Sequence, residues 1–248
     1  MPFTYPYPRP SVTCDVVAFT LRENDLAVLL IQRKDAPFRG RWALPGGFVN
    51  ENEPLARAAA RELEEETGVS GVRLEQLGAF GDPGRDPRGH TVTVAFTTFM
   101  LAEGAITAGD DAARAEWKTF RSLSLSEVQK ARSMPPPPVL GKPKRRSALP
   151  RGGVAIELAF DHAKIVSRAY NRLCRHLDDP VHDASFDIVP SRFTLPELKR
   201  LYEVVLGRRL SSQWFRRYFL ARGLVVPATS KKPKASAQLY RWNRRSSE

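Results

Sequence analysis

Residues 47–69, GFVNENEPLARAAARELEEETGV, decide the fold of this chain. The stretch opens on a glycine and then passes into a run of good helix formers. It predicts a helix over residues 54–67, because proline suits a first turn and Gly68 is placed to end the helix. Leu55, Ala59 and Leu63 recur every four residues, which predicts that they face a core.

The same helix carries closely spaced acidic side chains. Glu62 precedes Glu65 by three residues and Glu66 by four, so the three carboxylates share one helix face. They repel one another there unless a divalent cation is bound, and Mg²⁺ favours a few carboxylates together with water and phosphate oxygens. The alternative is an ordinary acidic face in water. We predict a Mg²⁺ (or Mn²⁺) site at Glu62, Glu65 and Glu66, closely approached by the backbone of Gly47.

Three further positions of the stretch are expected to have structural roles. We predict that Arg61 orients one of the acids through a bidentate pair. Glu53 is expected to brace the loop or to belong to an outer layer of the site. Gly68 is expected only to terminate the helix.

Strands and helices alternate over the first two thirds of the chain, which predicts an α/β domain. The expected strands cover residues 11–20, 25–34, 72–80, 91–101 and 115–120, and the expected helices cover 54–67, 125–132 and 161–177. Residues 41–49 are expected to form a loop and a strand that two glycines allow to bend sharply. Ile165, Ala169, Leu173 and Leu177 form the apolar stripe of the last helix.

Residues 134–153, MPPPPVLGKPKRRSALPRGG, interrupt this pattern, because four consecutive prolines suit neither a core strand nor a helix. We interpret them as an exposed insert in a first domain over residues 1–180. A ligand for a proline-binding domain and a basic localisation signal are the alternatives. After an acidic break, a second domain is expected over residues 185–248.

The net charge of +12 is concentrated in that second domain. Residues 191–248 hold 14 basic and 3 acidic residues, a net charge of +11, whereas the other 190 residues hold 25 and 24. This asymmetry favours a polyanionic partner for the last quarter of the chain. The alternative, a basic tail that only adds solubility, lacks the fold signal found there.

The sequence of the second domain predicts a helix, a turn, a second helix and a two-stranded ribbon. Thr194 and Glu197 form a capping box, Gly207 is placed to end the first helix, and the second helix starts near Ser211 or Ser212. Phe215, Phe219 and Leu220 are expected to pack inward, and residues 224–226 and 238–242 are expected to pair. The pattern indicates a winged helix, whose second helix enters the major groove of DNA; protein docking is the alternative. The basic residues predicted to contact DNA are Arg216, Arg217, Arg222, Lys231, Lys232 and Lys234.

Composition excludes several other classes. Cys14 and Cys174 are isolated, which disfavours a disulfide framework or a structural zinc site and favours a reducing compartment, the cytoplasm. The N-terminus lacks a secretory signal, and no apolar stretch of about 18 residues predicts a membrane span.

The fixed positions of residues 47–69 match G-x5-E-x7-R-E-U-x-E-E-x-G-U, where U is aliphatic. The chain therefore resembles the Nudix superfamily, whose members typically cleave a nucleoside diphosphate linked to another group. The resemblance implies a Nudix α/β/α sandwich with a mixed sheet, followed by a small winged helix-turn-helix domain. WALPGGFV (42–49), the stretch 74–96, LAFDH (158–162) and FTLPELKRLYEVVLG (193–207) further resemble the subgroup that joins an ADP-ribose-recognising Nudix domain to a winged helix.

This subgroup includes NrtR-type repressors of NAD metabolism genes and related ADP-ribose pyrophosphatases. The resemblance implies that Glu62, Glu65 and Glu66 are the catalytic, metal-binding glutamates. Arg85 and Arg88 lie in a loop typical of members that recognise ADP-ribose, where either can hold a phosphate bidentately, although a polar turn is the plain alternative. Arg33 is the third residue expected to bind substrate.

Two functions follow from the resemblance. The undamaged signature favours Mg²⁺-dependent hydrolysis of ADP-ribose, or of a similar nucleotide, to AMP and ribose 5-phosphate. The basic winged helix favours a DNA-binding repressor that uses its Nudix domain as an ADP-ribose sensor. We place hydrolysis first, and we expect a homodimer, because palindromic operators are usually bound by dimers.

Overall fold

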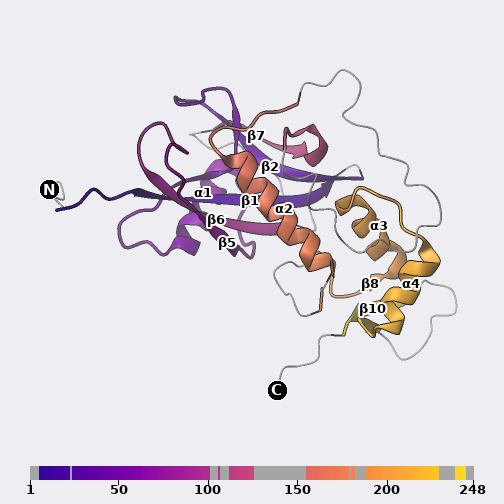
Figure 1. Cartoon of the computed structure of the whole chain (residues 1–248). Coiled ribbons are helices and arrows are strands. Elements are labelled where there is room, and N and C mark those ends of the chain that lie inside the picture. Colours follow the sequence, from indigo (N-terminus) through magenta and orange to yellow (C-terminus); the bar gives the residue numbers. More distant parts are fainter. Residues whose placement is uncertain are drawn as a thin grey trace.

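The computed structural model describes residues 6–22, 24–100, 106, 112–125, 155–178, 180–181, 188–228 and 238–243. An α/β domain is followed by a winged-helix unit (Figure 1). Three predicted features fall outside the described residues, and so does the expected boundary between the domains. The features are the insert over 134–153, nearly all of the helix over 125–132, and the wing-tip residues Lys231, Lys232 and Lys234.

A mixed seven-stranded sheet forms the centre of the first domain. Its strands are β1 (Ser11–Arg22), β2 (Asp25–Arg33), β3 (Trp42–Ala43), β4 (Gly46–Phe48), β5 (Glu75–Phe80), β6 (Thr91–Met100) and β7 (Ala112–Thr119). β1 and β6 are parallel, and every other pairing in this sheet is antiparallel. Residues 13–15 of β1 pair with β4, and residues 19–22 pair with β2. The register therefore sets the glycine strand β4 directly beside the start of β1.

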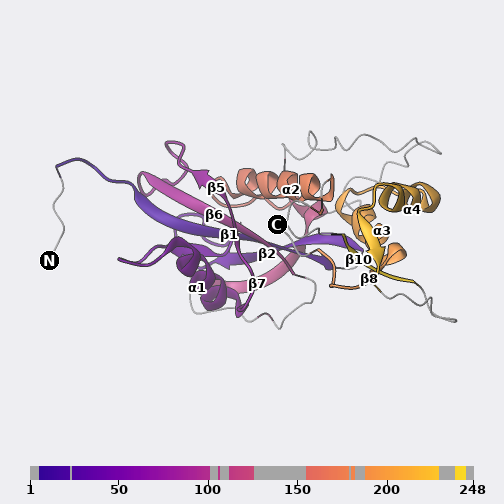
Figure 2. The same cartoon turned by 90° about the horizontal axis from the view of Figure 1, so that it is seen from below.

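Helices α1 (Leu55–Thr67) and α2 (His162–Asp178) cover opposite faces of the sheet (Figure 2). Val16 and Ala18 of β1 belong to the apolar cluster of α1, whereas Val17 and Phe19 belong to the cluster of α2. β1 is apolar on both sides because both sides are covered. The predicted stripe of α2 is confirmed, since all four of its residues are buried.

Helix α1 begins one residue later than predicted, with Pro54 as its N-cap. Gly68 ends it in the left-handed conformation, at φ 72°, and its N–H donates to the carbonyl of Glu64. The prediction that Leu55 faces the core is wrong: Leu55 is 36% exposed. It lies in the first turn, whereas the buried side of the helix starts in the second turn at Ala58.

Two strands start three residues away from their predicted starts. β5 starts at Glu75 rather than at residue 72. Gly71 bends the chain at φ 68°, and Val72 and Leu74 pack against the apolar cluster of α1 instead of pairing with β6. β7 starts three residues earlier than predicted and passes into a short 3-10 helix, η1 (Phe120–Ser122).

The second unit is a winged helix. It comprises α3 (Leu195–Val205), α4 (Ser212–Ala221) and the strands β8 (Phe193–Thr194), β9 (Val225–Pro227) and β10 (Leu239–Trp242), in the sheet order β8-β10-β9. Both halves of the predicted capping box form, and the Ser211 hydroxyl accepts from the N–H of Trp214. Phe215 and Phe219 are buried as predicted, whereas Leu220 is only half-buried and strand β8 was not expected.

The winged helix packs against the C-terminal half of α2. The Tyr170 hydroxyl donates to the carbonyl of Val205 at 2.8 Å, and the Tyr202 hydroxyl donates to the carbonyl of Leu177 at 2.9 Å. Both tyrosines are buried, and one apolar cluster extends from β1 through α2 into α3 and α4. Within the described residues, no helix is long and apolar enough to cross a membrane.

The burial of α1 predicts a large difference between its two leucines. Leu63→Ala should lower the free energy of unfolding by about 2–5 kcal/mol, because Leu63 is 1% exposed and its loss leaves a cavity. Leu55→Ala, the matched control on the same helix, should cost less than about 1 kcal/mol. Urea unfolding followed by circular dichroism measures both, and equal losses would contradict the packing described for this helix.

Candidate active site and ligand pocket

Arg61 connects the loop before α1, strand β4 and the acidic face of the helix. Its Nε and Nη2 atoms donate to the two carboxylate oxygens of Glu53, each at 2.8 Å. Nη2 also donates to the carbonyl of Phe48 at 3.1 Å, and Nη1 donates to Glu62 at 2.7 Å and to Glu65 at 3.0 Å. The predicted bidentate pair therefore forms with Glu53 and not with one of the three acids on the helix, each of which Arg61 contacts at one point or not at all. One cation offsets the repulsion among several carboxylates.

Two of the predicted metal ligands lie against the glycine pair of β4. A side chain at Gly47 would place its Cβ 2.6 Å from the carboxylate of Glu62, so glycine lets this carboxylate lie against the strand, and any other residue would displace it. The Glu66 carboxylate accepts from the N–H of Gly46 at 2.8 Å. Burial raises the pKa of Glu62, and a nearby cation would favour its charged form. Glu65 is more exposed, at 58% of its side chain, and points to Arg61.

The arrangement can be compared with what a metal ion needs. Within the described residues, no three His, Cys, Asp or Glu side chains form a ready-made metal cage. The donor set nevertheless fits a hard cation, because Glu62 and Glu66 bring carboxylate oxygens to adjacent residues of a close-packed glycine strand. Any ion held there would therefore also use water or ligand oxygens.

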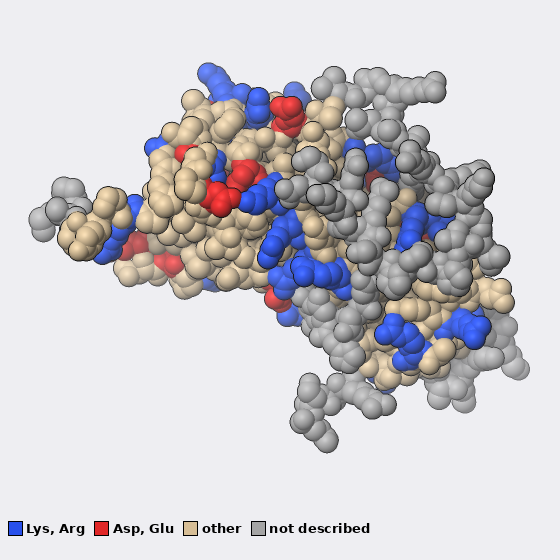
Figure 3. Space-filling view, viewed as in Figure 1, with Lys and Arg blue, Asp and Glu red and all other residues tan. Residues whose placement is uncertain are grey.

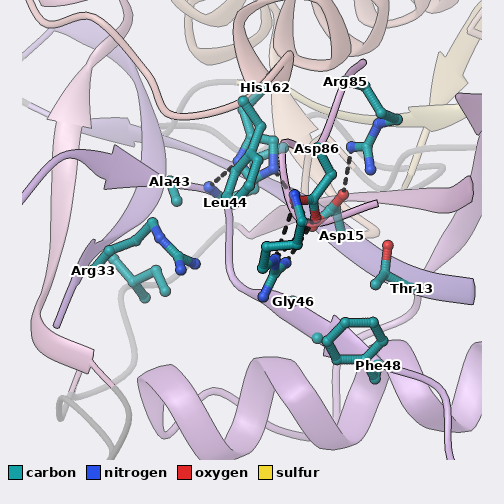
Figure 4. A pocket seen from close by; sticks show the side chains of 14 residues that line it. Thr13, Asp15, Arg33, Ala43, Leu44, Gly46, Phe48, Arg85, Asp86 and His162 are labelled. Carbon is teal, nitrogen blue, oxygen red and sulfur yellow. Dashed lines mark hydrogen bonds and ion pairs between the residues drawn. The ribbon is translucent and has the colours of Figure 1, made fainter. Parts of the chain in front are cut away.

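A pocket opens on the other side of the same glycines (Figure 4). Its walls come from β1, β2, β3, β4, the loop after β5 and the start of α2. All three residues predicted to bind substrate, Arg33, Arg85 and Arg88, line it. A neighbouring hollow shares Arg33 and Arg88 with this pocket and reaches Glu66. The two arginines thus lie between the acidic helix and the pocket floor.

The three arginines differ in their contacts. Asp161 binds Arg85 bidentately, with the shortest contact at 2.7 Å, and only 4% of the Arg85 side chain is exposed. Asp86 binds Arg88 bidentately, but 44% of the Arg88 side chain is exposed, and its guanidinium lies over the rings of Phe48 and Phe160. The guanidinium of Arg33 also lies over Phe160, while its Nε donates to the carbonyl of Pro37.

The floor of the pocket holds a buried acid that the sequence analysis did not identify. Asp15 is 6% exposed, and within the described residues its Oδ2 accepts no hydrogen bond. Arg85 Nη2 lies 3.6 Å from that oxygen, and His162 Nε2 lies 3.7 Å from Oδ1. His162 Nδ1 accepts from the N–H of Leu44 at 2.8 Å, and burial lowers the pKa of His162. The imidazole is therefore neutral, with its proton on Nε2 and directed to Asp15.

Some of these residues had a signal in the sequence. Asp15 is the one charged residue in the apolar run over residues 11–20, which indicates a buried functional or paired group. Asp161 and His162 end the LAFDH stretch. The pairing of Arg85 with Asp161 has no local signal, because 76 residues separate the two.

The candidate DNA-binding residues lie on and after α4. Arg216 and Arg217 are exposed, on the side of the helix away from the buried Phe215 and Phe219. Arg222 is exposed after the helix, with its guanidinium over the ring of Tyr218. The second helix of the motif therefore presents its arginines to solvent.

The Glu53–Arg61 pair predicts a specific acid sensitivity. Hydrogen bonds from Arg61 lower the pKa of Glu53 from 4.5 to about 2. Because this folded-state pKa lies below that of the unfolded chain, the carboxylate stabilises the fold above about pH 4.5, and the contribution is lost as the pH falls towards about 2. Urea unfolding of Glu53→Gln should therefore show a smaller loss of stability over this range than the unmodified chain. Glu51→Gln, in the same loop and exposed, should retain the full loss; identical pH profiles for all three proteins would refute this role of Glu53.

Comparison with known proteins agrees with this geometry. The family model of the NUDIX domain matches residues 13–139, and that of the NrtR DNA-binding winged helix domain matches residues 185–242. Helix α2 lies between the two matched ranges.

Individual relatives match either nearly the whole chain or about half of it. The "ADPR responsive transcriptional repressor NtrR" of Acinetobacter baylyi is 31% identical over 95% of this chain and 83% of its own length. The "ADP-ribose pyrophosphatase" of Methanocaldococcus jannaschii is 41% identical over 47% of this chain and 66% of its own length. The crystal structure of Shewanella oneidensis NrtR complexed with a 27mer DNA is 28% identical, covers 94% of each chain, and superposes with a TM-score of 0.58. The chain belongs to the Nudix family, in the NrtR-like group that joins a NUDIX domain to a DNA-binding winged helix domain.

Proposed function

We propose that the Nudix domain binds ADP-ribose, or a similar nucleoside diphosphate derivative, and hydrolyses its diphosphate with Mg²⁺ or Mn²⁺. The observation that carries this proposal is the placement of Glu62 and Glu66 against Gly47 and Gly46, beside a pocket lined by three arginines. The names of the relatives supply the ligand class, since one is an ADPR-responsive repressor and one is an ADP-ribose pyrophosphatase.

The residues of the site have different proposed roles, which follow from their positions. Glu62, Glu65 and Glu66 would hold the cation, which polarises a phosphoryl oxygen and lowers the pKa of attacking water when bound. Arg33 and Arg88 lie where the pocket and the neighbouring hollow meet, so a diphosphate that reaches the cation passes them. Arg88 is exposed enough to exchange Asp86 for a phosphate, whereas Arg85 is held by Asp161 and is suited to positioning Asp15.

Substitutions on α1 test this assignment. Glu66→Gln should reduce the rate of AMP formation from ADP-ribose by roughly 10²- to 10⁴-fold, because the fold is kept while a metal-holding carboxylate is lost. Glu64→Gln, an exposed neighbour on the same helix, should keep the unmodified rate. Product analysis gives the rate, and calorimetry with ADP-ribose gives the affinity. Binding of ADP-ribose by the unmodified chain without any turnover would leave a sensor and exclude the hydrolase.

The winged helix supports a second function. We propose that residues 185–248 form a domain that binds double-stranded DNA, and that residues 1–180 form the domain whose ligand alters this binding, as in an NrtR-type repressor. The exposed arginines of α4 support DNA binding, and so do the match to the NrtR DNA-binding winged helix domain and the similarity to a relative solved in complex with DNA. A homodimer belongs to this proposal, since repressors of palindromic sites are usually symmetric.

Removal of the α4 charges tests the second function. Arg216→Ala/Arg217→Ala should weaken binding to a duplex selected from a random library by roughly tenfold or more, because both groups are expected at phosphates or base edges. Arg57→Ala/Arg114→Ala, which removes two exposed charges from α1 and β7, should bind as the unmodified chain does. Fluorescence anisotropy with and without ADP-ribose measures both effects. No selectable duplex, or equal affinities for the two double variants, would overturn the assignment.

A further inference from the structure

The outer side of α2 carries a row of basic side chains that no function described above uses. Lys164, Arg168, Arg172 and Arg175 are spaced by four, four and three residues, so they follow one face of the helix. The opposite face is the buried stripe that packs on the sheet. Residues 162–177 contain no Asp or Glu, and the one acidic residue of the helix is Asp178 at its last position, three residues after Arg175.

Two of these side chains have no hydrogen-bond or ion-pair partner among the described residues. Lys164 contacts Asp82 at 2.5 Å, and Arg172 donates to the carbonyl of Gln76. Arg168 and Arg175 are exposed, and no acceptor for either side chain occurs in the described part of the chain. Like charges at these spacings weaken a helix slightly, so the stability of α2 does not require them.

The row is held in a fixed position relative to the winged helix. The buried hydrogen bonds of Tyr170 and Tyr202 join α2 to α3, close to Arg168 and Arg175 in sequence. Helices α2 and α4 lie on the same side of the molecule, away from α1 (Figure 2). Figure 3 shows Lys and Arg side chains gathered over α2 and again over the winged helix, on one face.

We propose that α2 extends the DNA-binding surface, so that a duplex bound at α4 continues across the Nudix domain and places phosphates against Arg168 and Arg175. This inference rests on the proposed DNA binding and adds a contact outside the winged helix. The two arginines are about 10 Å apart along the helix, at 1.5 Å per residue. That separation corresponds to about three axial rises of 3.4 Å between phosphates of one DNA strand, so both can reach the same backbone.

The salt dependence of binding distinguishes phosphate contacts from other roles. Arg168→Ala/Arg175→Ala in the full chain should weaken binding to the selected duplex roughly tenfold at moderate salt. It should also lower the slope of log affinity against log salt by about 2, because each lost phosphate contact removes about 0.9. Arg168→Lys/Arg175→Lys keeps both charges and should retain the slope. The control Arg57→Ala/Arg114→Ala should leave affinity and slope unchanged.

Each outcome has a defined meaning. Circular dichroism and light scattering should show the same fold and mass for every variant; a changed mass would make α2 a subunit interface and overturn the proposal. A slope equal to that of the unmodified chain would also overturn it, as would a loss of affinity for single-stranded RNA but not for the duplex. If the unmodified chain binds no duplex, the proposed DNA-binding function fails first, and this inference fails with it.

Discussion

The guanidinium of Arg61 is the contact on which the acidic site depends. Its five hydrogen bonds reach Glu53 in the preceding loop, the carbonyl of Phe48 in β4, and Glu62 and Glu65 on α1. Without this cation, several carboxylates would repel one another beside the glycine strand β4. A lysine would not serve, because it cannot present a planar fork to Glu53 and still reach the other acceptors.

The strand that Arg61 holds also determines where the pocket lies. Gly46 pairs with Asp15 in the register of β4 and β1, so the acid on the pocket floor lies directly across from the glycine that binds Glu66. The acidic helix on one side of the sheet and the start of α2 on the other are thereby brought to the same strand. A ligand bound here meets the carboxylates of α1, two accessible arginines and a buried carboxylate within one short stretch of structure.

Sequence reasoning was most successful where the signal was local. Gly68, the capping box of Thr194 and Glu197, and the stripe of α2 each depend on residues within a few turns, and the structure has them as predicted. Leu55 was wrong because a spacing of four residues defines a stripe but not the turn at which the sheet begins to cover it. Asp15 and the Arg85–Asp161 pair escaped prediction because their partners come from distant segments, and only the register of the sheet brings them together.

The apolar cluster shared by α2, α3 and α4 has a mechanical consequence. The part of the winged helix that contacts α2 is buried, and so are the two tyrosine hydrogen bonds there. Each bond contributes roughly 1 kcal/mol to folding stability, and a buried donor or acceptor left without a partner would cost more than that. The winged helix therefore has a fixed orientation relative to the Nudix domain and is not joined to it only by a flexible linker. A rigid connection therefore runs from the pocket to the winged helix, because the first residue of α2, His162, lies in the pocket wall and Arg200 of α3 also donates to Asn24, just before β2.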